Sequence, residues 1–468
     1  MEGDFFRINN LKPRPTSSSN GLWIQFLLPL SVIISVFKHS ITTTPTYKLA
    51  SLICTGMIFV SLIISMQKYR KQRLKVFSLW TILALAATSA LFHICLHKDV
   101  PFSVFGGFFS TVLYFQIYKF LLKHFKESFT LGEAAIICQG LTLMLYFTIL
   151  NFVNHTTRPL PFKSNIQVAT LIIQLGLLGI LAIAVCSYYF KIKNTVPFYT
   201  ISSVIIVGVI IIPLHILLQR SPILWILNQM VEDLSMVKLM LYWLFCTGIA
   251  ILAISNQIFY AQKASTSTRK VFHLLAVVVY IPGLLYRCSF LYLASGVVLG
   301  IFLALEILRL LHLPPLGIYL QDGFVVFSDE KDGYLSLTPI YLLVGSSLPI
   351  WIHPSPCDVT DSASFNLIPL LSGILSIGVG DTAASVVGST YGKFFWPGSK
   401  KTIEGTVACI LSQIGILYML LYFGFIQIIS STDALRLFVA IVITSVVEAK
   451  TTQVDNLVLP FIMYIILI

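Results

Sequence analysis

Charged residues are scarce in this chain of 468 residues, of which 11% are Asp, Glu, Lys or Arg and 57% are hydrophobic. A soluble globular protein carries about 25% charged residues, so the shortage excludes a water-soluble fold. Apolar runs of roughly 17–25 residues recur and are continuous rather than alternating, which favours membrane helices over barrel strands. Because only helices and closed barrels satisfy their backbone groups in hydrocarbon, we expect an all-α, polytopic transmembrane helical bundle.

Paired cysteine motifs and internal repeats are also missing. The eight cysteines are scattered singly with no CxxC spacing, which argues against a zinc or redox site, and we expect them to behave as small hydrophobic residues. The formal net charge is +12. The Lys and Arg residues that produce this charge lie in short loops between apolar runs. In membrane proteins such positively charged loops set the orientation of the chain in the bilayer. We therefore expect no binding of nucleic acid.

The apolar runs predict about fifteen membrane helices. Their ranges are 21–37, 49–66, 77–96, 101–118, 132–153, 167–190, 196–218, 237–260, 270–285, 288–311, 339–353, 366–391, 403–428, 434–448 and 456–468. Residues 222–230 resemble a half-segment. We expect a disordered cytoplasmic N-terminus at 1–20 without a cleavable signal peptide, an N-terminal membrane region at 21–260 and a C-terminal catalytic membrane region at 261–468.

The loops predict the orientation. Residues 67–75 carry five Lys or Arg, and short basic loops face the cytoplasm. Alternation from that loop then places 261–269, 312–338, 392–402 and 449–455 in the cytoplasm as well. The sequon Asn154-His155-Thr156 falls on the lumenal side, which agrees weakly with this orientation.

Residues Gly378–Gly405 contain the densest group of polar residues within an apolar region. Asp381 lies inside a predicted membrane helix, where an ionisable group is costly and usually faces a cavity or a partner. Small residues share its helical face, including Gly388 and Gly392, so a GxxxG packing face is the structural alternative.

The glycine-punctuated loop 392–402 that follows is cationic. Its lysines, hydroxyls and backbone amides suit a polyphosphate, and Trp396 could stack on a base. The aromatic residues could equally form an interfacial belt and the lysines a topology signal.

Further acids follow this loop. Glu404 opens the next helix and is either a dipole-compensating residue or a second metal ligand. Glu448 and Asp455 flank a short polar stretch and suit magnesium, which prefers oxygen ligands. Lys270 and His273 begin another helix on the same side, where Lys270 could contact phosphate and His273 could exchange a proton. Glu306 with Arg309 forms an i, i+3 pair that could be purely structural.

Taken together, these motifs resemble the dolichol kinase family of polyprenol kinases. The matching segments are STRKVFH (267–273), ALEILR (304–309), LTPIYLLVGSSLPIW (337–351), GVGDTAAS to KKTIEGT (378–406) and EAKTTQVDNLVLP (448–460). Lys450 departs from the family, whose members commonly carry an uncharged residue there. The first 260 residues are similar to the family only in hydropathy.

The resemblance implies transfer of the γ-phosphate of CTP to the terminal hydroxyl of dolichol. The products would be dolichyl phosphate and CDP, and the active site would face the cytoplasm at the endoplasmic reticulum membrane. It also implies a divalent cation such as Mg²⁺, CTP as co-substrate, and a CTP-binding region at 388–403. A CTP-dependent lipid cytidylyltransferase and a multi-helix transporter are the alternatives; oligomeric state is not predicted.

Three sets of site residues follow. The expected catalytic residues are Asp381, Glu448, Asp455 and His273. The expected metal ligands are Asp381, Glu404, Glu448 and Asp455. The expected nucleotide-binding residues are Gly388, Ser389, Thr390, Tyr391, Gly392, Lys393, Trp396, Pro397, Gly398, Ser399, Lys400, Lys401, Thr402 and Lys270.

Overall fold

A computed structural model describes residues 11–15, 21–39, 44–70, 74–157, 162, 164–231, 233–259, 266–327, 332–354, 357, 365–428 and 430–468. Within these residues the chain is all-helical apart from one isolated antiparallel bridge, Phe395 to Thr402. The expected all-α fold is confirmed for the described part of the chain.

The N-terminal half forms a run of helices with two π-helical turns. In order they are η1 (Leu22–Phe26), α2 (Leu27–Lys38), α3 (Pro45–Arg70), α4 (Leu74–Leu96), α5 (Val100–Phe108), the π-helix η2 (Phe109–Leu113), α6 (Tyr114–His124), α7 (Leu131–Thr157), α8 (Asn165–Tyr189), α9 (Thr195–Ile205), the π-helix η3 (Ile206–Ile211), α10 (Ile212–Leu218), α11 (Pro222–Met230) and α12 (Leu234–Phe259). The predicted half-segment at 222–230 coincides with α11.

The C-terminal half carries longer and more interrupted helices. They are α13 (Thr266–Leu310), α14 (Leu316–Phe327), α15 (Thr338–Ile352), the 3₁₀ helix η4 (Phe365–Leu371), the π-helix η5 (Ile374–Asp381), α17 (Thr382–Tyr391), α18 (Ile403–Tyr422), α19 (Ser431–Lys450) and α20 (Asp455–Leu467). Arg287 has non-helical dihedral angles, so α13 is two helices joined at a turn. Helix α14 lies inside the range 312–338, where the sequence predicted only a loop.

Each of the fifteen predicted ranges overlaps a helix among the described residues, although α18 ends at Tyr422, six residues before the end of the range 403–428. Nine helical stretches among the described residues are long and apolar enough to cross a membrane, and one of them, Arg269–Leu310, combines two predicted helices. The shorter apolar helices are Leu22–Lys38, Thr338–Ile352 and Asp455–Leu467. The structure thus supports a multi-pass membrane protein without establishing fifteen crossings.

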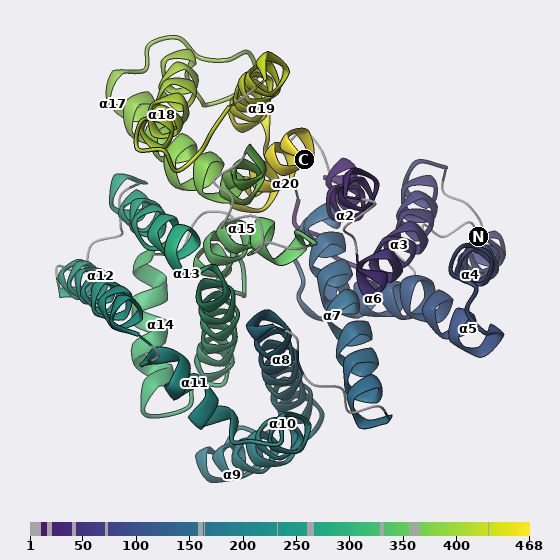
Figure 1. The fold of residues 1–468 in the computed structure, drawn as a ribbon. Helices are drawn as coiled ribbons and strands as arrows, with labels where there is room; N and C mark the ends of the chain where they lie inside the picture. The colour runs from purple at the N-terminus through teal and green to yellow at the C-terminus, as the bar shows by residue number, and fades with distance from the viewer. Residues whose placement is uncertain are drawn as a thin grey trace.

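Helices α15 and α20 pack against each other near the middle of the molecule (Figure 1). Helix α20 also contacts α2 from the N-terminal half and α19 and η5 from the C-terminal half. The largest hydrophobic core accordingly joins residues of α2–α7, such as Tyr114 and Tyr118, to Val458 and Phe461 of α20. The two halves therefore share a core, and α15 and α20 connect them.

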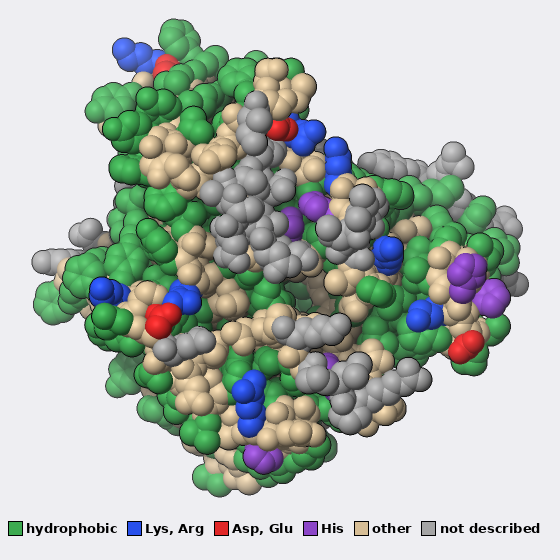
Figure 2. Space-filling view, in the orientation of Figure 1, with side chains coloured by type: hydrophobic (Ala, Val, Ile, Leu, Met, Phe, Trp, Pro, Cys, Tyr) green, Lys and Arg blue, Asp and Glu red, His purple; other side chains and the backbone are tan. Residues whose placement is uncertain are grey.

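Hydrophobic side chains dominate the surface, and charged side chains gather in only a few places (Figure 2). On α12, for example, Leu244, Phe245 and Leu252 are each more than half exposed. In water such a surface would be strongly unfavourable. In a bilayer it contacts lipid, which explains why these helices need no apolar neighbour on their outer faces.

Cys288 and Cys357 form a disulfide bond, with their Cα atoms 5.3 Å apart. The expectation that every cysteine behaves as a small hydrophobic residue is wrong for this pair. Cys288 follows the turn at Arg287 and Cys357 follows α15, so the two are 69 residues apart in sequence. Only the packing of α13 beside α15 brings them together.

Candidate active site

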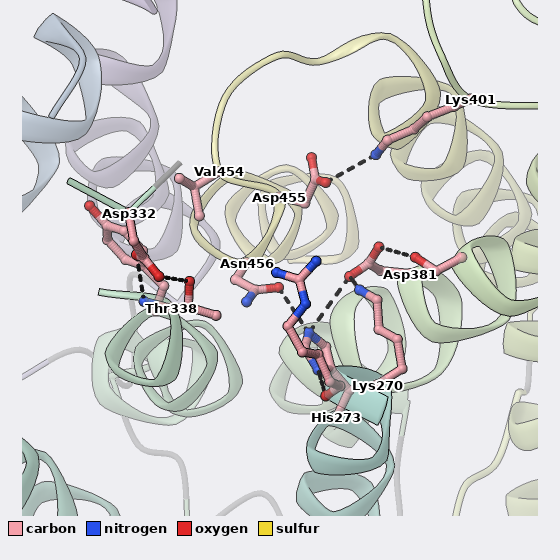
Figure 3. A pocket seen from close by; sticks show the side chains of 12 residues that line it. Lys270, His273, Asp332, Thr338, Asp381, Lys401, Val454, Asp455 and Asn456 are labelled. Carbon is pink, nitrogen blue, oxygen red and sulfur yellow. Dashed lines mark hydrogen bonds and ion pairs between the residues drawn. The ribbon is translucent and has the colours of Figure 1, made fainter. Parts of the chain in front are cut away.

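A cavity of about 180 Å³ lies where α13, α15, α17 and α20 meet. Its lining residues are Arg269, Lys270, His273, Asp332, Thr338, Tyr341, Asp381, Ser385, Lys401, Val454, Asp455 and Asn456. Side chains from these separate segments point toward one another across the cavity (Figure 3). Three acids and several basic groups therefore share one small space.

Asp381 ends the π-helix η5 and is 3% exposed. A π-helical turn widens the helix and is often found at functional sites. Glycines let neighbouring helices approach this turn closely. A Cβ atom on Gly380 would lie 2.8 Å from Nε2 of Gln413 in α18, and one on Gly378 would overlap Val277 in α13. The glycines of this segment therefore serve packing that presses the Asp381 turn between α13 and α18.

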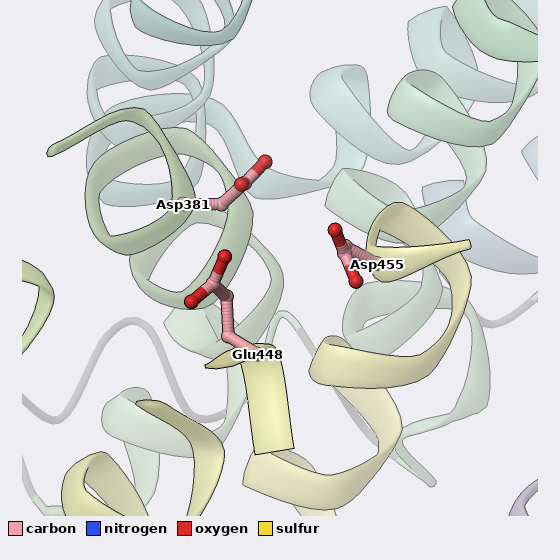
Figure 4. A group of neighbouring side chains, drawn as sticks. All are labelled: Asp381, Glu448 and Asp455. Atoms are coloured by element: carbon pink, nitrogen blue, oxygen red, sulfur yellow. The ribbon is translucent and has the colours of Figure 1, made fainter. Parts of the chain in front are cut away.

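Asp381, Glu448 and Asp455 form a triad of carboxylates. One oxygen of each lies within 4.8 Å of the others, and the three side chains surround a common space (Figure 4). Glu448 is buried at the end of α19, and Asp455 is half-buried at the start of α20. Oδ1 of Asp455 is buried and has no hydrogen-bond partner. This oxygen-only donor set fits a hard divalent cation.

Two lysines offset the charge of this triad. The Lys270 ammonium pairs with Asp381. The Lys401 ammonium pairs with Glu448 and lies 3.0 Å from Oδ2 of Asp455. With three carboxylates ionised and two lysines protonated, the cluster carries one net negative charge, which leaves it attractive to a cation.

Lys401 itself is stabilised in its charged form. Burial alone would lower the pKa of the Lys401 ammonium, but the carboxylates of Asp455, Glu448 and Asp381 outweigh burial and hold that pKa well above its ordinary value. Lys401 also donates a 2.8 Å hydrogen bond to the carbonyl oxygen of Glu448. It therefore remains a fixed positive charge beside the triad at any physiological pH.

His273 lies behind Asp381 and is buried. Its Nε2 atom is 3.8 Å from Oδ2 of Asp381 and 3.3 Å from Oδ1 of Asn456, while Nδ1 is 3.3 Å from the carbonyl oxygen of Arg269. Both ring nitrogens thus already face oxygen atoms of the protein. This arrangement orients the ring and suits support of Asp381.

Asp332 forms the opposite wall of the cavity. Its carboxylate accepts hydrogen bonds from the Leu337 and Thr338 backbone amides, at 3.0 and 3.1 Å, and from the Thr338 hydroxyl at 2.6 Å. These bonds cap the start of α15. Sequence reasoning missed Asp332 and Tyr341 as cavity residues; the only available signal was a polar segment followed by Thr338-Pro339, a typical helix start.

The Glu306–Arg309 pair anchors that wall. Arg309 donates two hydrogen bonds to the Glu306 carboxylate, at 2.6 and 2.8 Å, and one of 2.9 Å to the carbonyl oxygen of Tyr334. Glu306 also accepts the Ser336 amide at 3.0 Å. These contacts make the Glu306–Arg309 pair a structural bridge, as the sequence allowed.

Residues 392–402 form a hairpin-like loop that packs on the end of α19. The Ser399 hydroxyl donates to the carbonyl oxygen of Ala449 at 2.8 Å. Trp396 donates through Nε1 to the Thr406 hydroxyl at 2.9 Å, and the Lys450 ammonium lies 5.4 Å from its ring centroid. Lys401 is the loop residue that lines the cavity.

The other predicted cations of the loop, Lys393 and Lys400, are exposed and do not line the cavity. Glu404 accepts hydrogen bonds from the backbone amides of Lys393, at 3.0 Å, and Phe394, at 3.2 Å. It lies outside the carboxylate triad found among the described residues. Glu404 thus ties the two ends of the loop together.

The small residues before the loop pack against α18. A Cβ atom on Gly388 would lie 2.9 Å from the Thr402 hydroxyl oxygen, and one on Gly405 would lie 2.8 Å from the carbonyl oxygen of Ala384. Thr402 caps α18 by accepting the Gly405 amide at 3.2 Å. The close helix packing that a GxxxG face would provide is realised at Gly388.

The remaining predicted nucleotide residues lie outside the cavity lining. The Ser389 and Thr390 hydroxyls donate to the carbonyl oxygen of Val386, at 3.1 and 2.8 Å. Tyr391, Gly392, Pro397 and Gly398 form the exposed end of α17 and the turn of the loop, where Gly398 has a left-handed φ of 74°. Lys270, by contrast, is in the cavity.

Comparisons with known proteins point to one family. A family model described as "Dolichol kinase" matches residues 108–332, so the expectation that the first 260 residues resemble the family only in hydropathy is wrong from residue 108 on. The chain is 35% identical over 369 residues to a protein named dolichol kinase from Bos taurus, covering 76% of this chain and 68% of that protein. It is 34% identical over 367 residues to the dolichol kinase of Mus musculus, with the same coverage. The dolichol kinase of Saccharomyces cerevisiae is 29% identical over 255 residues, covering 54% of this chain and 46% of that protein. No solved structure matches.

Proposed function

The chain belongs to the dolichol kinase family, and we propose that it transfers the γ-phosphate of CTP to the terminal hydroxyl of dolichol. Dolichyl phosphate, a lipid carrier for glycan assembly, and CDP are the products. The observation that carries the proposal is the triad of Asp381, Glu448 and Asp455 with Lys270 and Lys401 in one cavity. Phosphoryl transfer depends on positioning and charge neutralisation, and this cluster supplies both.

Asp381, Glu448 and Asp455 would hold a divalent cation such as Mg²⁺. The cation would supply charge neutralisation for the polyphosphate, as in other phosphoryl-transfer enzymes. The protein's part is to keep three carboxylate oxygens within 4.8 Å of one another. In the absence of a cation, Lys270 and Lys401 offset the mutual repulsion of the three carboxylates. A bound cation would take over that role and free the lysines.

Lys270 and Lys401 are also the cations best placed to contact the nucleotide phosphates, since both line the cavity. A lysine that pairs with a carboxylate in the absence of nucleotide can turn toward a phosphate oxygen without losing its charge partner entirely. Lys393 and Lys400 lie on the exposed side of the 392–402 loop. We propose that they attract the nucleotide electrostatically rather than hold it.

The alcohol must lose a proton as its oxygen attacks phosphorus. We propose Asp455 as the acceptor, because its Oδ1 atom has no hydrogen-bond partner and it lines the cavity. Asp332 already accepts three hydrogen bonds. His273 is buried with both nitrogens facing protein oxygens. Unlike Asp332 and His273, Asp455 therefore has an acceptor atom that is not already engaged.

We propose further that the cavity faces the cytoplasm at the endoplasmic reticulum membrane. Lys270 and Tyr286, the last residue before the turn at Arg287, are 16 residues apart on the first half of α13, a rise of roughly 24 Å at 1.5 Å per residue, which is most of the thickness of the hydrocarbon core. Cys288 directly follows that turn. The Cys288–Cys357 disulfide thus lies at the other end of a membrane-length helix from the cavity. Disulfides persist in oxidising compartments such as the lumen, so the disulfide agrees with the orientation predicted from the basic loops.

One experiment tests the reaction and the donor together. Purified chain in lipid nanodiscs is supplied with a long-chain polyprenol, Mg²⁺ and either CTP or ATP labelled at the γ-phosphate. We expect label in the lipid from CTP, with CDP released in equal amount. Release of pyrophosphate with cytidine in the lipid would establish a cytidylyltransferase instead. Absence of any labelled lipid, together with ion-driven solute uptake in proteoliposomes, would establish a transporter.

A further inference from the structure

A buried ion pair in the N-terminal half lies next to the catalytic acids of the C-terminal half. The Nη2 atom of Arg14 is 2.7 Å from Oε1 and 2.8 Å from Oε2 of Glu133. Glu133 is 0% exposed, and it begins α7, far in sequence from the cavity. A buried carboxylate requires a charged or hydrogen-bonded partner, and Arg14 supplies one.

The segment that carries Arg14 is held by the backbone. Residues 11–15 belong to the predicted N-terminal segment 1–20, of which the other residues lie outside the described residues. The Arg14 amide donates to the carbonyl oxygen of Phe129 at 2.7 Å, and the Glu127 amide donates to that of Lys12 at 2.8 Å. Arg14 is thus positioned by main-chain bonds to the loop before α7.

Glu133 has a local role that its sequence context explains. Its Oε2 atom accepts the Thr130 amide at 3.0 Å, and the Glu133 amide donates to the Thr130 hydroxyl oxygen at 3.2 Å. This reciprocal pair is a capping box at the start of α7. A capping box is usually exposed and needs no arginine, so burial and the contact with Arg14 call for a further explanation.

The further contacts lead to the catalytic loop. The Val454 amide donates to Oε1 of Glu133 at 3.3 Å, and the Thr130 hydroxyl donates to Oε1 of Gln453 at 2.7 Å. Val454 is the N-cap residue of α20 and directly precedes Asp455. Gly21, at a left-handed φ of 67°, packs so closely on Gln453 that a Cβ atom there would overlap it.

We propose that Arg14 and Glu133 are positioning residues that hold the 451–455 loop so that Asp455 faces the other two carboxylates. This positioning role rests on the proposed function in one respect, namely that Asp455 is a member of the metal-binding triad. Arg14 fixes the orientation of the Glu133 carboxylate through two hydrogen bonds, and that orientation directs Oε1 toward the Val454 amide. The N-terminal half therefore contributes to the active site through two short contacts.

The test compares full-length variants in nanodiscs. Arg14→Met removes the positive charge beside Glu133, and Arg14→Lys keeps that charge with fewer hydrogen-bond donors. Thr130→Val removes the hydrogen bond to Gln453 without changing any charge. Asp233→Asn is the matched control, because it breaks the Arg287–Asp233 ion pair at the turn within α13, next to the disulfide and away from the cavity. Hydrogen–deuterium exchange of residues 452–456 is measured without metal or nucleotide, and the Mg²⁺ concentration for half-maximal activity is measured separately from kcat.

We expect exchange at 452–456 to be at least about tenfold faster in Arg14→Met, with a smaller increase in Arg14→Lys and Thr130→Val and none in Asp233→Asn. The Mg²⁺ requirement should rise in the same order. Unchanged exchange at 452–456 in Arg14→Met would overturn the proposal. Faster exchange of equal size in α8 would also overturn it, since the ion pair would then stabilise the whole fold. If exchange responds as expected but no variant, nor the parent chain, phosphorylates a polyprenol, the positioning role stands and the proposed function fails.

Discussion

Asp381→Asn tests the carboxylate triad most directly. Two unit charges 4.8 Å apart, the upper limit among the triad oxygens, interact by about 3.5 kcal/mol at an effective dielectric constant of about 20. A divalent cation held among the three oxygens would lie closer to each of them than the oxygens lie to one another, so it loses at least about 7 kcal/mol of attraction when one carboxylate is neutralised, before its dehydration is counted. If only a third of that remains after dehydration, cation affinity falls by about 50-fold.

The same substitution should be compatible with folding. It removes the charge partner of Lys270, but it also removes the repulsion between Asp381 and the other two carboxylates. The net charge of the cluster changes from one negative charge to zero, so the largest electrostatic costs offset each other. We expect Asp381→Asn to insert and fold with an unchanged disulfide and near-normal thermal stability in nanodiscs.

The assay is Mn²⁺ binding followed by electron paramagnetic resonance, beside phosphorylation of polyprenol across a range of Mg²⁺ concentrations. Asp433→Asn is a matched control, since it makes the same charge change in the first turn of α19, at the opposite end of that helix from Glu448. We expect weak Mn²⁺ binding and a loss of activity of at least about 100-fold in Asp381→Asn alone. Parent-like activity at ordinary Mg²⁺ in Asp381→Asn would refute the metal role of the triad.

Four other outcomes follow from the structure. Lys401→Met removes a positive charge from between two carboxylates, so Mn²⁺ should bind at least as tightly as in the parent while phosphate transfer slows by about 100-fold or more; weakened Mn²⁺ binding would contradict this. Glu404→Ala should raise the KM for CTP, because it loosens the 392–402 loop, and it should leave the Mg²⁺ requirement unchanged. If the Mg²⁺ requirement of Glu404→Ala rose as much as that of Asp381→Asn, Glu404 would belong among the metal ligands. Chelation with EDTA should abolish activity and added Mg²⁺ should restore it, whereas activity that persists in EDTA would rule out an essential divalent cation. In sealed microsomes, a membrane-impermeant maleimide added after reduction should label Cys288 and Cys357 only once the vesicles are permeabilised; labelling of intact vesicles would reverse the proposed orientation.

Much of the site could be predicted from sequence because membrane segments make polar residues conspicuous. A carboxylate such as Asp381 inside an apolar run must have a partner or a cavity. Glu448 and Asp455 border the same short interruption between two apolar runs, so they can converge where that interruption is a loop. The structure places the three together beside Lys270 and Lys401, two of the lysines that the sequence indicated as phosphate contacts.

The loop 392–402 shows where such reasoning stops. Its lysines have the same composition and similar spacing, yet Lys401 faces the cavity while Lys393 and Lys400 are exposed. Glu404 suited a metal shell equally well in sequence, but its carboxylate accepts backbone amides of the loop instead. Side-chain direction in an irregular loop depends on what the loop packs against, and residue type alone does not contain that information.

The chain's composition and apolar runs by themselves determined the helical membrane fold, the positions of most of its helices and the segments that carry chemistry, because burial in lipid leaves few alternatives to a helix. Tertiary packing alone decided which of the acids and lysines meet, that Cys288 joins Cys357, and that Glu133 of the first half contacts Val454 of the second. These pairings join residues 69 and 321 positions apart. No local pattern encodes such distances; they follow from helix packing around α15 and α20.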